Sequence, residues 1–94
     1  MPAYIIASIE VTDPDDYMTY ARQTVALAEK WGGRFLVKGG NPETVEGTTA
    51  SRQVVIEFPD RATAKAWYNS DEYCEILPIA LRASKRDIAI VDGV

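Results

Sequence analysis

Side chains suited to binding and transforming a small organic acid are spread over the second half of the chain and the strand before it. Arg34 and Lys38 lie four residues apart, and a guanidinium can hold a carboxylate through two parallel hydrogen bonds. Glu46 follows in a segment rich in glycine and threonine, where partial burial would make its carboxylate a general base. The alternative interpretations are a charged edge strand for Arg34 and Lys38 and a solvated loop carboxylate for Glu46.

Three residues spaced by three, Trp67, Ser70 and Tyr73, form a second candidate group. A helix, or a capped turn between two helices, would bring them to one side of the chain. Together they offer aromatic surface and two hydroxyl groups, a combination typical of small-molecule pockets, and Tyr73 could also transfer a proton. The structural alternative is a core tryptophan, a helix-capping serine and a tyrosine at the rim.

Glycines and one late arginine complete the candidate site. Gly39 and Gly40 lack a Cβ, so a ligand could approach the backbone there, although the pair could equally serve only as a turn. Arg82 precedes the last expected strand and needs a partner, either a carboxylate of this chain or an anionic group of a ligand. We therefore predict Glu46 and Tyr73 as catalytic residues and the others as substrate-binding residues.

Composition excludes several classes of protein. The chain has 94 residues, no histidine and a single cysteine, Cys74, so a metal site, a haem site and a disulfide framework are not expected. A net charge of −4 argues against nucleic acid and anionic membranes as partners. No signal peptide or membrane-spanning run is recognisable, and we expect a cytoplasmic protein without a cofactor.

The elements that must position these residues follow from periodicity and capping signals. Strands are predicted over 3–11, 34–38, 51–58 and 88–91. Helices are predicted over 14–31 and 61–68, with Asp13 and Asp60 as N-caps. A short helix is predicted between Ser70 and Pro78, followed by irregular or helical structure through Arg82. Segment 39–50 is predicted as a loop, and its length is typical of a functional loop.

This order predicts a single α+β domain, residues 1–94, with a ferredoxin-like β-α-β-β-α-β topology and a four-stranded antiparallel sheet. Right-handed connections place the first and third strands in the centre and the helices on one face. The other face would carry Ile6, Ser8 and Glu10 from the first strand. A mixed apolar and polar sheet face left uncovered by helices indicates a homodimer in which two sheets pack together.

Several segments resemble the DUF1330 family, a domain of unknown function: GGRFLVKGG at 32–40, VEG at 45–47, RQVVIEFPD at 52–60, AKAWYNSDEY at 64–73, and Arg82. The resemblance covers nearly the whole chain. It implies membership of the dimeric α+β barrels, whose sheets pack face to face. Related barrel families include cofactor-independent monooxygenases of aromatic substrates, small isomerases and haem-degrading enzymes, and the absence of histidine argues against the last of these.

Two hypotheses of different classes remain open from the sequence. The first is a cofactor-independent monooxygenase or isomerase acting on a small aromatic or enolisable acid, in which Arg34 or Arg82 holds the anion and Glu46 or a tyrosine moves a proton. The second is a non-catalytic ligand-binding or structural homodimer. The sequence does not identify the substrate, the reaction or whether the protein is an enzyme.

Overall fold

Four strands and three helices follow one another in the computed structural model, which describes residues 1–94. They are β1 (Ala3–Val11), α1 (Pro14–Lys30), β2 (Arg34–Gly39), β3 (Arg52–Phe58), α2 (Arg61–Tyr68), α3 (Asp71–Ala83) and β4 (Ser84–Asp92). The strands form one sheet in the order β2-β3-β1-β4, and all neighbours are antiparallel. The predicted ferredoxin-like topology, with the first and third strands in the centre, is confirmed.

Side-chain caps start all three helices where the sequence indicates. Asp13 accepts a hydrogen bond from the backbone N–H of Asp16 at 3.2 Å, and Asp60 accepts one from Thr63 at 2.7 Å. Ser70 accepts one from the backbone N–H of Tyr73 at 3.2 Å. Each cap satisfies an N–H group that has no partner within its helix.

The helix predicted before Pro78 is longer than expected, because α3 continues through Pro78 to Ala83, and the segment expected to be irregular or helical is helical. A proline inside a helix removes one backbone hydrogen bond and costs about 3 kcal/mol. The buried residues of α3 recur at spacings of three and four on both sides of this proline: Tyr73, Ile76, Ala80 and Ala83. Burial of this continuous stripe offsets the cost. The last strand is likewise longer than predicted and begins at Ser84.

In the second strand, simple alternation predicts Phe35 and Val37 on one face and Arg34, Leu36 and Lys38 on the other, and this prediction was wrong beyond Phe35. A β-bulge between Phe35 and Val37 shifts the register, so that Phe35 lies beside Ile56 and Lys38 lies beside Val54. Because an extra residue in one strand reverses which face the following side chains occupy, Phe35 and Lys38 share the helix-covered face. The bulge thereby brings a lysine to the edge of the core.

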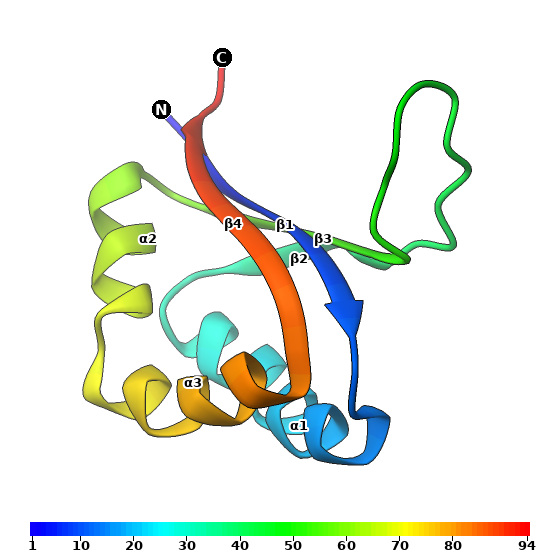
Figure 1. Ribbon diagram of the computed structural model, residues 1–94. Helices are drawn as coiled ribbons and strands as arrows, with labels where there is room; N and C mark the ends of the chain where they lie inside the picture. Colours follow the sequence, from blue (N-terminus) through cyan, green and yellow to red (C-terminus); the bar gives the residue numbers. More distant parts are fainter.

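All three helices cover the same face of the sheet, and Figure 1 shows them on one side of the strands. The helix-facing residues of β1 and β3 are buried, including Ile5, Ile56 and Phe58. The opposite face carries no helix, and Ile6 and Val91 are 38% and 39% exposed there. Segment 40–51, drawn in green, extends away from the body of the sheet (Figure 1). This arrangement leaves one packed layer and one open sheet face.

Candidate functional site

Two arginines enter the helix-covered face in the same row of the sheet. Arg52 of β3 and Arg86 of β4 are both register partners of Ile9 in β1, one on each side. Ile9 is buried, and residues that share a row on adjacent strands point to the same face. The core layer therefore has a cationic end, although cores are normally built from apolar side chains.

The following rows of the same face are apolar and leave a cavity beneath the helices. Ala7 lies between Val54 and Ile88, and the small side chains of Ala7 and Ala21 leave space that larger residues would fill. The cavity has a volume of about 40 Å³ and 14 of its 18 lining residues are hydrophobic. Its charged lining residues are Lys38, Arg52 and Arg86, and no carboxylate lines it.

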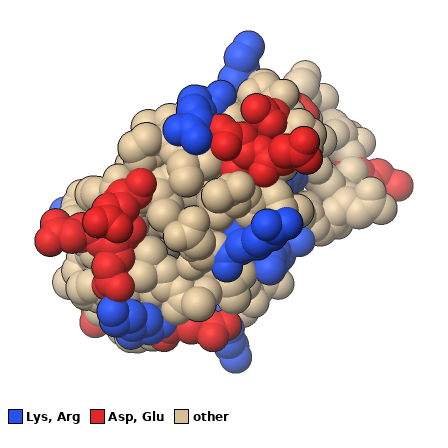
Figure 2. Space-filling view, turned by 90° about the horizontal axis from the view of Figure 1, so that it is seen from below, with Lys and Arg blue, Asp and Glu red and all other residues tan.

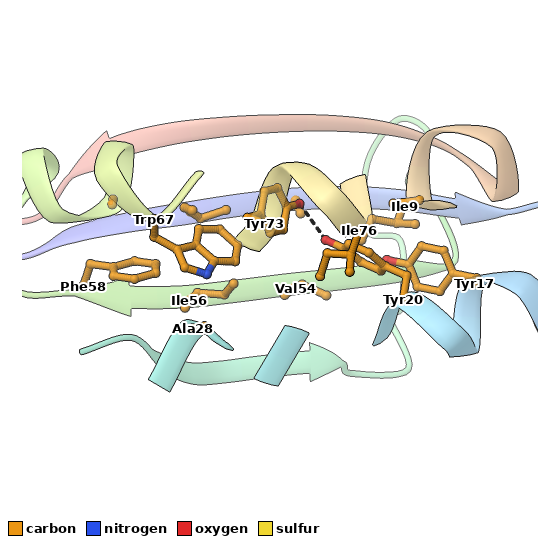
Figure 3. Packing of buried hydrophobic residues seen from close by; sticks show 14 of the residues in the cluster. Ile9, Tyr17, Tyr20, Ala28, Val54, Ile56, Phe58, Trp67, Tyr73 and Ile76 are labelled. Atoms are coloured by element: carbon orange, nitrogen blue, oxygen red, sulfur yellow. Dashed lines mark hydrogen bonds between the residues drawn. The ribbon is translucent and has the colours of Figure 1, made fainter. Parts of the chain in front are cut away.

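Hydrogen bonds between buried groups fix the polar end of this cavity. The hydroxyl oxygens of Tyr20 and Tyr73 lie 2.6 Å apart (Figure 3). Arg86 donates to both, at 3.1 Å to Tyr20 and 3.0 Å to Tyr73. The Cζ atom of Arg86 also lies 5.2 Å from the centroid of the Tyr20 ring, within cation–π range. One arginine and two phenols from three different elements thus form a single network.

The protonation states of this network follow from its surroundings. Burial raises the pKa of Tyr73 above its ordinary value, and the adjacent Tyr20 raises it further. Burial alone would lower the pKa of Arg86, but the two tyrosine hydroxyls outweigh it and the net shift is upward. Both tyrosines face a guanidinium that stays charged at neutral pH. The cavity therefore holds the neutral phenol of Tyr73 next to a permanent positive charge.

Trp67 of α2 closes the apolar end. Its ring centroid lies 4.4 Å from that of Tyr73 and 5.4 Å from that of Phe58. The residue is only 2% exposed, yet its indole N–H has no hydrogen-bond partner. In Figure 3 the indole nitrogen lies on the side of the ring that faces Ile56, which also lines the cavity. A buried donor without an acceptor is uncommon, and a ligand acceptor or a water would satisfy it.

A wider groove opens next to the cavity at its cationic end. The groove has a volume of about 480 Å³, and its lining includes Pro14 and Met18 of α1 and the cationic residues Arg22, Lys38 and Arg52. Four residues line both spaces: Tyr17, Ala21, Lys38 and Arg52. The groove therefore leads into the cavity between α1 and the edge of the sheet, and it too contains no carboxylate.

The distribution of ion pairs makes this lining unusual. The chain has 10 basic and 14 acidic residues, and four of the basic residues form ion pairs with carboxylates. Of the six others, four line the cavity or the groove: Arg22, Lys38, Arg52 and Arg86. On the face seen in Figure 2, acidic and basic side chains form separate patches next to one another. Free positive charge in this acidic protein is thus concentrated in two connected hollows.

The structure brings together some of the predicted site residues and separates others. Trp67 and Tyr73 line the cavity. Ser70 joins them, because its hydroxyl donates to the carbonyl of Trp67 at 2.7 Å and accepts from the N–H of Tyr73. A Cβ on Gly39 would lie 3.1 Å from the Arg52 guanidinium, so this glycine leaves room for the arginine.

Four other predicted residues lie outside the cavity. Arg34 pairs with Glu57 at 3.0 Å, and Arg82 pairs with Asp16 at 2.6 Å. The guanidinium of Arg82 holds the pKa of Asp16 below its usual value. Gly40 is an exposed turn residue with a positive φ of 72°, and Glu46 is exposed in the extended loop. None of these four lines the cavity or the groove.

Sequence reasoning did not select Arg52, Arg86 or Tyr20 as site residues. A signal for the arginines was present: Arg52 shares the period-two phase of Val54 and Ile56, and Arg86 shares that of Ile88. A charged residue in the phase of buried residues indicates either a strand end or a functional group. Only the strand register shows that both arginines lie in one row.

Other kinds of site are not found in the fold. No group of three or more histidine, cysteine, aspartate or glutamate residues is placed to hold a metal ion. None of the helices combines the length and the apolar character that crossing a membrane requires. The cavity and the groove are therefore the candidate site.

Fold and site together define a ferredoxin-like α+β protein with a cationic cavity between its helices and its sheet. The chain belongs to the family described as "Domain of unknown function (DUF1330)", whose model matches residues 2–94. None of the curated proteins matches it in sequence.

Solved structures of similar fold come from several bacteria. A protein of unknown function from Rhodopseudomonas palustris has a TM-score of 0.80 at 14% identity, covering 99% of this chain and 82% of that one. SnoaB, a cofactor-independent oxygenase from Streptomyces nogalater, has a TM-score of 0.69 at 9% identity, with 99% and 93% covered. A dimeric ferredoxin-like protein of unknown function from Thermobifida fusca has 0.61 at 14% identity, with 99% and 92% covered. At these identities the likeness shows the fold alone.

Proposed function

We propose that the protein binds a small organic acid with an apolar, aromatic body in the cavity between the helices and the sheet. The observation that carries the proposal is Arg86, a partly buried guanidinium that is bonded to two tyrosine hydroxyls and to no carboxylate. A buried charge is costly unless it is paired, and an anionic ligand would supply the missing partner. The apolar lining residues around it accommodate the body of the ligand.

Arg52 supports the proposal as the residue at the entrance. The cavity of about 40 Å³ is much smaller than typical small-molecule sites, so a ligand must displace side chains to enter. Arg52 lies at the junction with the groove, forms no ion pair, and leaves its buried Nε–H without a partner. Its long side chain can swing outward and then close on the anion through charge-assisted hydrogen bonds.

Catalysis is the second candidate, favoured by the phenol pair and by the fold that this chain shares with a cofactor-independent oxygenase. Arg86 and the hydroxyls of Tyr20 and Tyr73 could stabilise the negative charge of an enolate oxygen. Isomerisation or oxygenation of an enolisable acid would use this stabilisation. No carboxylate or imidazole lines the cavity, so a proton leaving carbon would pass to water or to the substrate's own carboxylate. Binding without turnover is the competing function.

Phenylpyruvate tests both candidates because it is an aromatic acid that enolises. Calorimetry should show binding to the natural sequence, and Arg86→Gln should weaken it about 10- to 100-fold, as expected for a lost charge-assisted hydrogen bond. Lys65→Gln, an exposed change outside both hollows, is the matched control and should bind normally. Equal affinities for Arg86→Gln and the natural sequence would contradict the proposal.

The same probe separates an enzyme from a binding protein. Tautomerisation of phenylpyruvate is followed by its ultraviolet absorbance. A rate above the buffer background that is lost in Tyr73→Phe supports catalysis. Binding without any rate increase supports a non-catalytic ligand-binding protein.

Assembly as a homodimer through the open sheet face is the third part of the proposal. The face exposes Ile6 and Val91, and one neighbour of similar fold is described as dimeric. Packing two such faces together would bury these residues, as isologous contacts commonly do. The alternative function is a structural homodimer without a ligand. Binding of phenylpyruvate would exclude this alternative, and an absence of binding would support it.

A further inference from the structure

We infer that the ligand carries a second anionic group, bound in the groove by Arg22 and Lys38 outside the cavity. The inference rests on the proposed function, because it describes the outward end of the same ligand. The groove would bind a carboxylate or a phosphate that is attached to the part of the ligand inside the cavity.

The first argument is the charge of the groove. Arg22, Lys38 and Arg52 line it together with apolar residues, and none of the three forms an ion pair. Its volume of about 480 Å³ is in the range of small-molecule sites. A monoanion held by Arg86 and Arg52 would leave Arg22 and Lys38 without a counter-ion.

The second argument is that two carboxylates close in sequence to the groove are engaged elsewhere. Asp13, which precedes Pro14 of the groove, caps α1 by accepting from the N–H of Asp16. Asp16 itself accepts two hydrogen bonds from Arg82, at 2.6 and 3.2 Å. Neither of these carboxylates lines the groove. No carboxylate lines the groove, and none forms an ion pair with its cations.

The third argument is geometric. Arg52 and Arg86 flank Ile9, so their backbones lie about 10 Å apart, twice the spacing of neighbouring strands. Arg52 lines both spaces, and Gly39 leaves room for its guanidinium beside Lys38. A ligand with one aromatic ring between two anionic ends would place one end at Arg86 and the other in the groove.

Three probes of matched shape test the inference. The first is 4-propylbenzoate, a monoanion. The second is 4-(2-carboxyethyl)benzoate, in which a carboxylate replaces the terminal methyl group, and the third is 4-(2-phosphonoethyl)benzoate. Calorimetry at low salt should give an affinity for at least one of the doubly anionic probes about tenfold or more above that for 4-propylbenzoate. The tighter of the two identifies the second group as a carboxylate or a phosphate.

Two variants with the same change in charge locate the effect. Arg22→Gln combined with Lys38→Gln should remove the preference for the second anion, so that the affinities for the three probes fall within about twofold of one another. Lys30→Gln combined with Lys65→Gln removes two exposed charges that line neither space, and it should keep the preference. Arg86→Gln should weaken all three probes.

The outcomes separate this inference from the proposed function. Equal affinities of all three probes for the natural sequence would overturn the second anionic group and leave the binding of organic acids intact. Loss of the preference in the Lys30/Lys65 control would also overturn it, since the effect would then be general attraction. Binding of none of the probes would overturn the proposed function itself.

Discussion

The hydroxyl oxygen of Tyr20 lies 2.6 Å from that of Tyr73, although 53 residues separate them in the chain. One comes from α1 and the other from α3, and Arg86 of β4 donates to both. This hydrogen bond therefore connects two helices above the sheet at the polar end of the cavity. It holds α1 and α3 together where they line the cavity and contributes to the stability of the fold.

A double-mutant cycle measures this connection. Tyr20→Phe and Tyr73→Phe should each lower the free energy of unfolding by about 1 kcal/mol, because each leaves the remaining hydroxyl with fewer partners. The double variant should cost less than the sum of the two, with a coupling of about 1 kcal/mol. Urea unfolding gives all three values. Strict additivity would show that the two hydroxyls do not stabilise one another.

Alkaline pH should destabilise the protein through its buried phenols. The pKa of Tyr73 and that of Tyr17 are raised above their ordinary value of 10.0, chiefly by burial. The unfolded chain then loses these protons at a lower pH than the folded chain, so stability is fully present below pH 10 and falls as the pH rises above it. Denaturant unfolding between pH 8 and pH 12 should show this decline, and Tyr73→Phe should reduce it. An unchanged slope in that variant would contradict the assignment.

Much of the fold could be predicted because local signals agreed with tertiary packing. The alternation of β1 and the caps at Asp13, Asp60 and Ser70 located the elements correctly. The predictions fell short where packing overrode a local rule, as at Pro78, which lies within α3. The bulge near Phe35 leaves no composition signal, and it decides which face Lys38 occupies.

The candidate site was less predictable because it depends on pairing between distant strands. Trp67 and Tyr73 are close in sequence, so their helical spacing predicted that they lie on one side of the chain. Arg52 and Arg86 lie in one row of the sheet because both pair with Ile9. No spacing within the sequence predicts this pairing. An exposed glutamate such as Glu46 has the same residue type as a catalytic glutamate. Only its position in the fold distinguishes a solvated loop residue from a catalytic one.

Ser70 should act as a positioning residue for the cavity wall. Its hydroxyl connects the last turn of α2, which carries Trp67, to the first turn of α3, which carries Tyr73. Ser70→Ala should lower the free energy of unfolding by about 1 kcal/mol through loss of the cap. It should also weaken phenylpyruvate binding, because both aromatic rings lose a restraint. Ser70→Asp, which can still cap α3, should recover most of the stability and tests whether capping is the cause.

Ile6 provides the test of assembly through the open sheet face. Its side chain is 38% exposed at the centre of β1, beside Val55 of β3 and Ala89 of β4. If two such faces pack together, Ile6→Lys introduces a charge into an apolar contact and should convert a dimer into a monomer, as measured by light scattering. Leu81→Lys is the matched control, because Leu81 is 59% exposed on α3, on the helical side of the molecule, and should leave the mass unchanged. A natural sequence that is monomeric at micromolar concentration, or an Ile6→Lys variant that stays dimeric, would show that this face is not the interface.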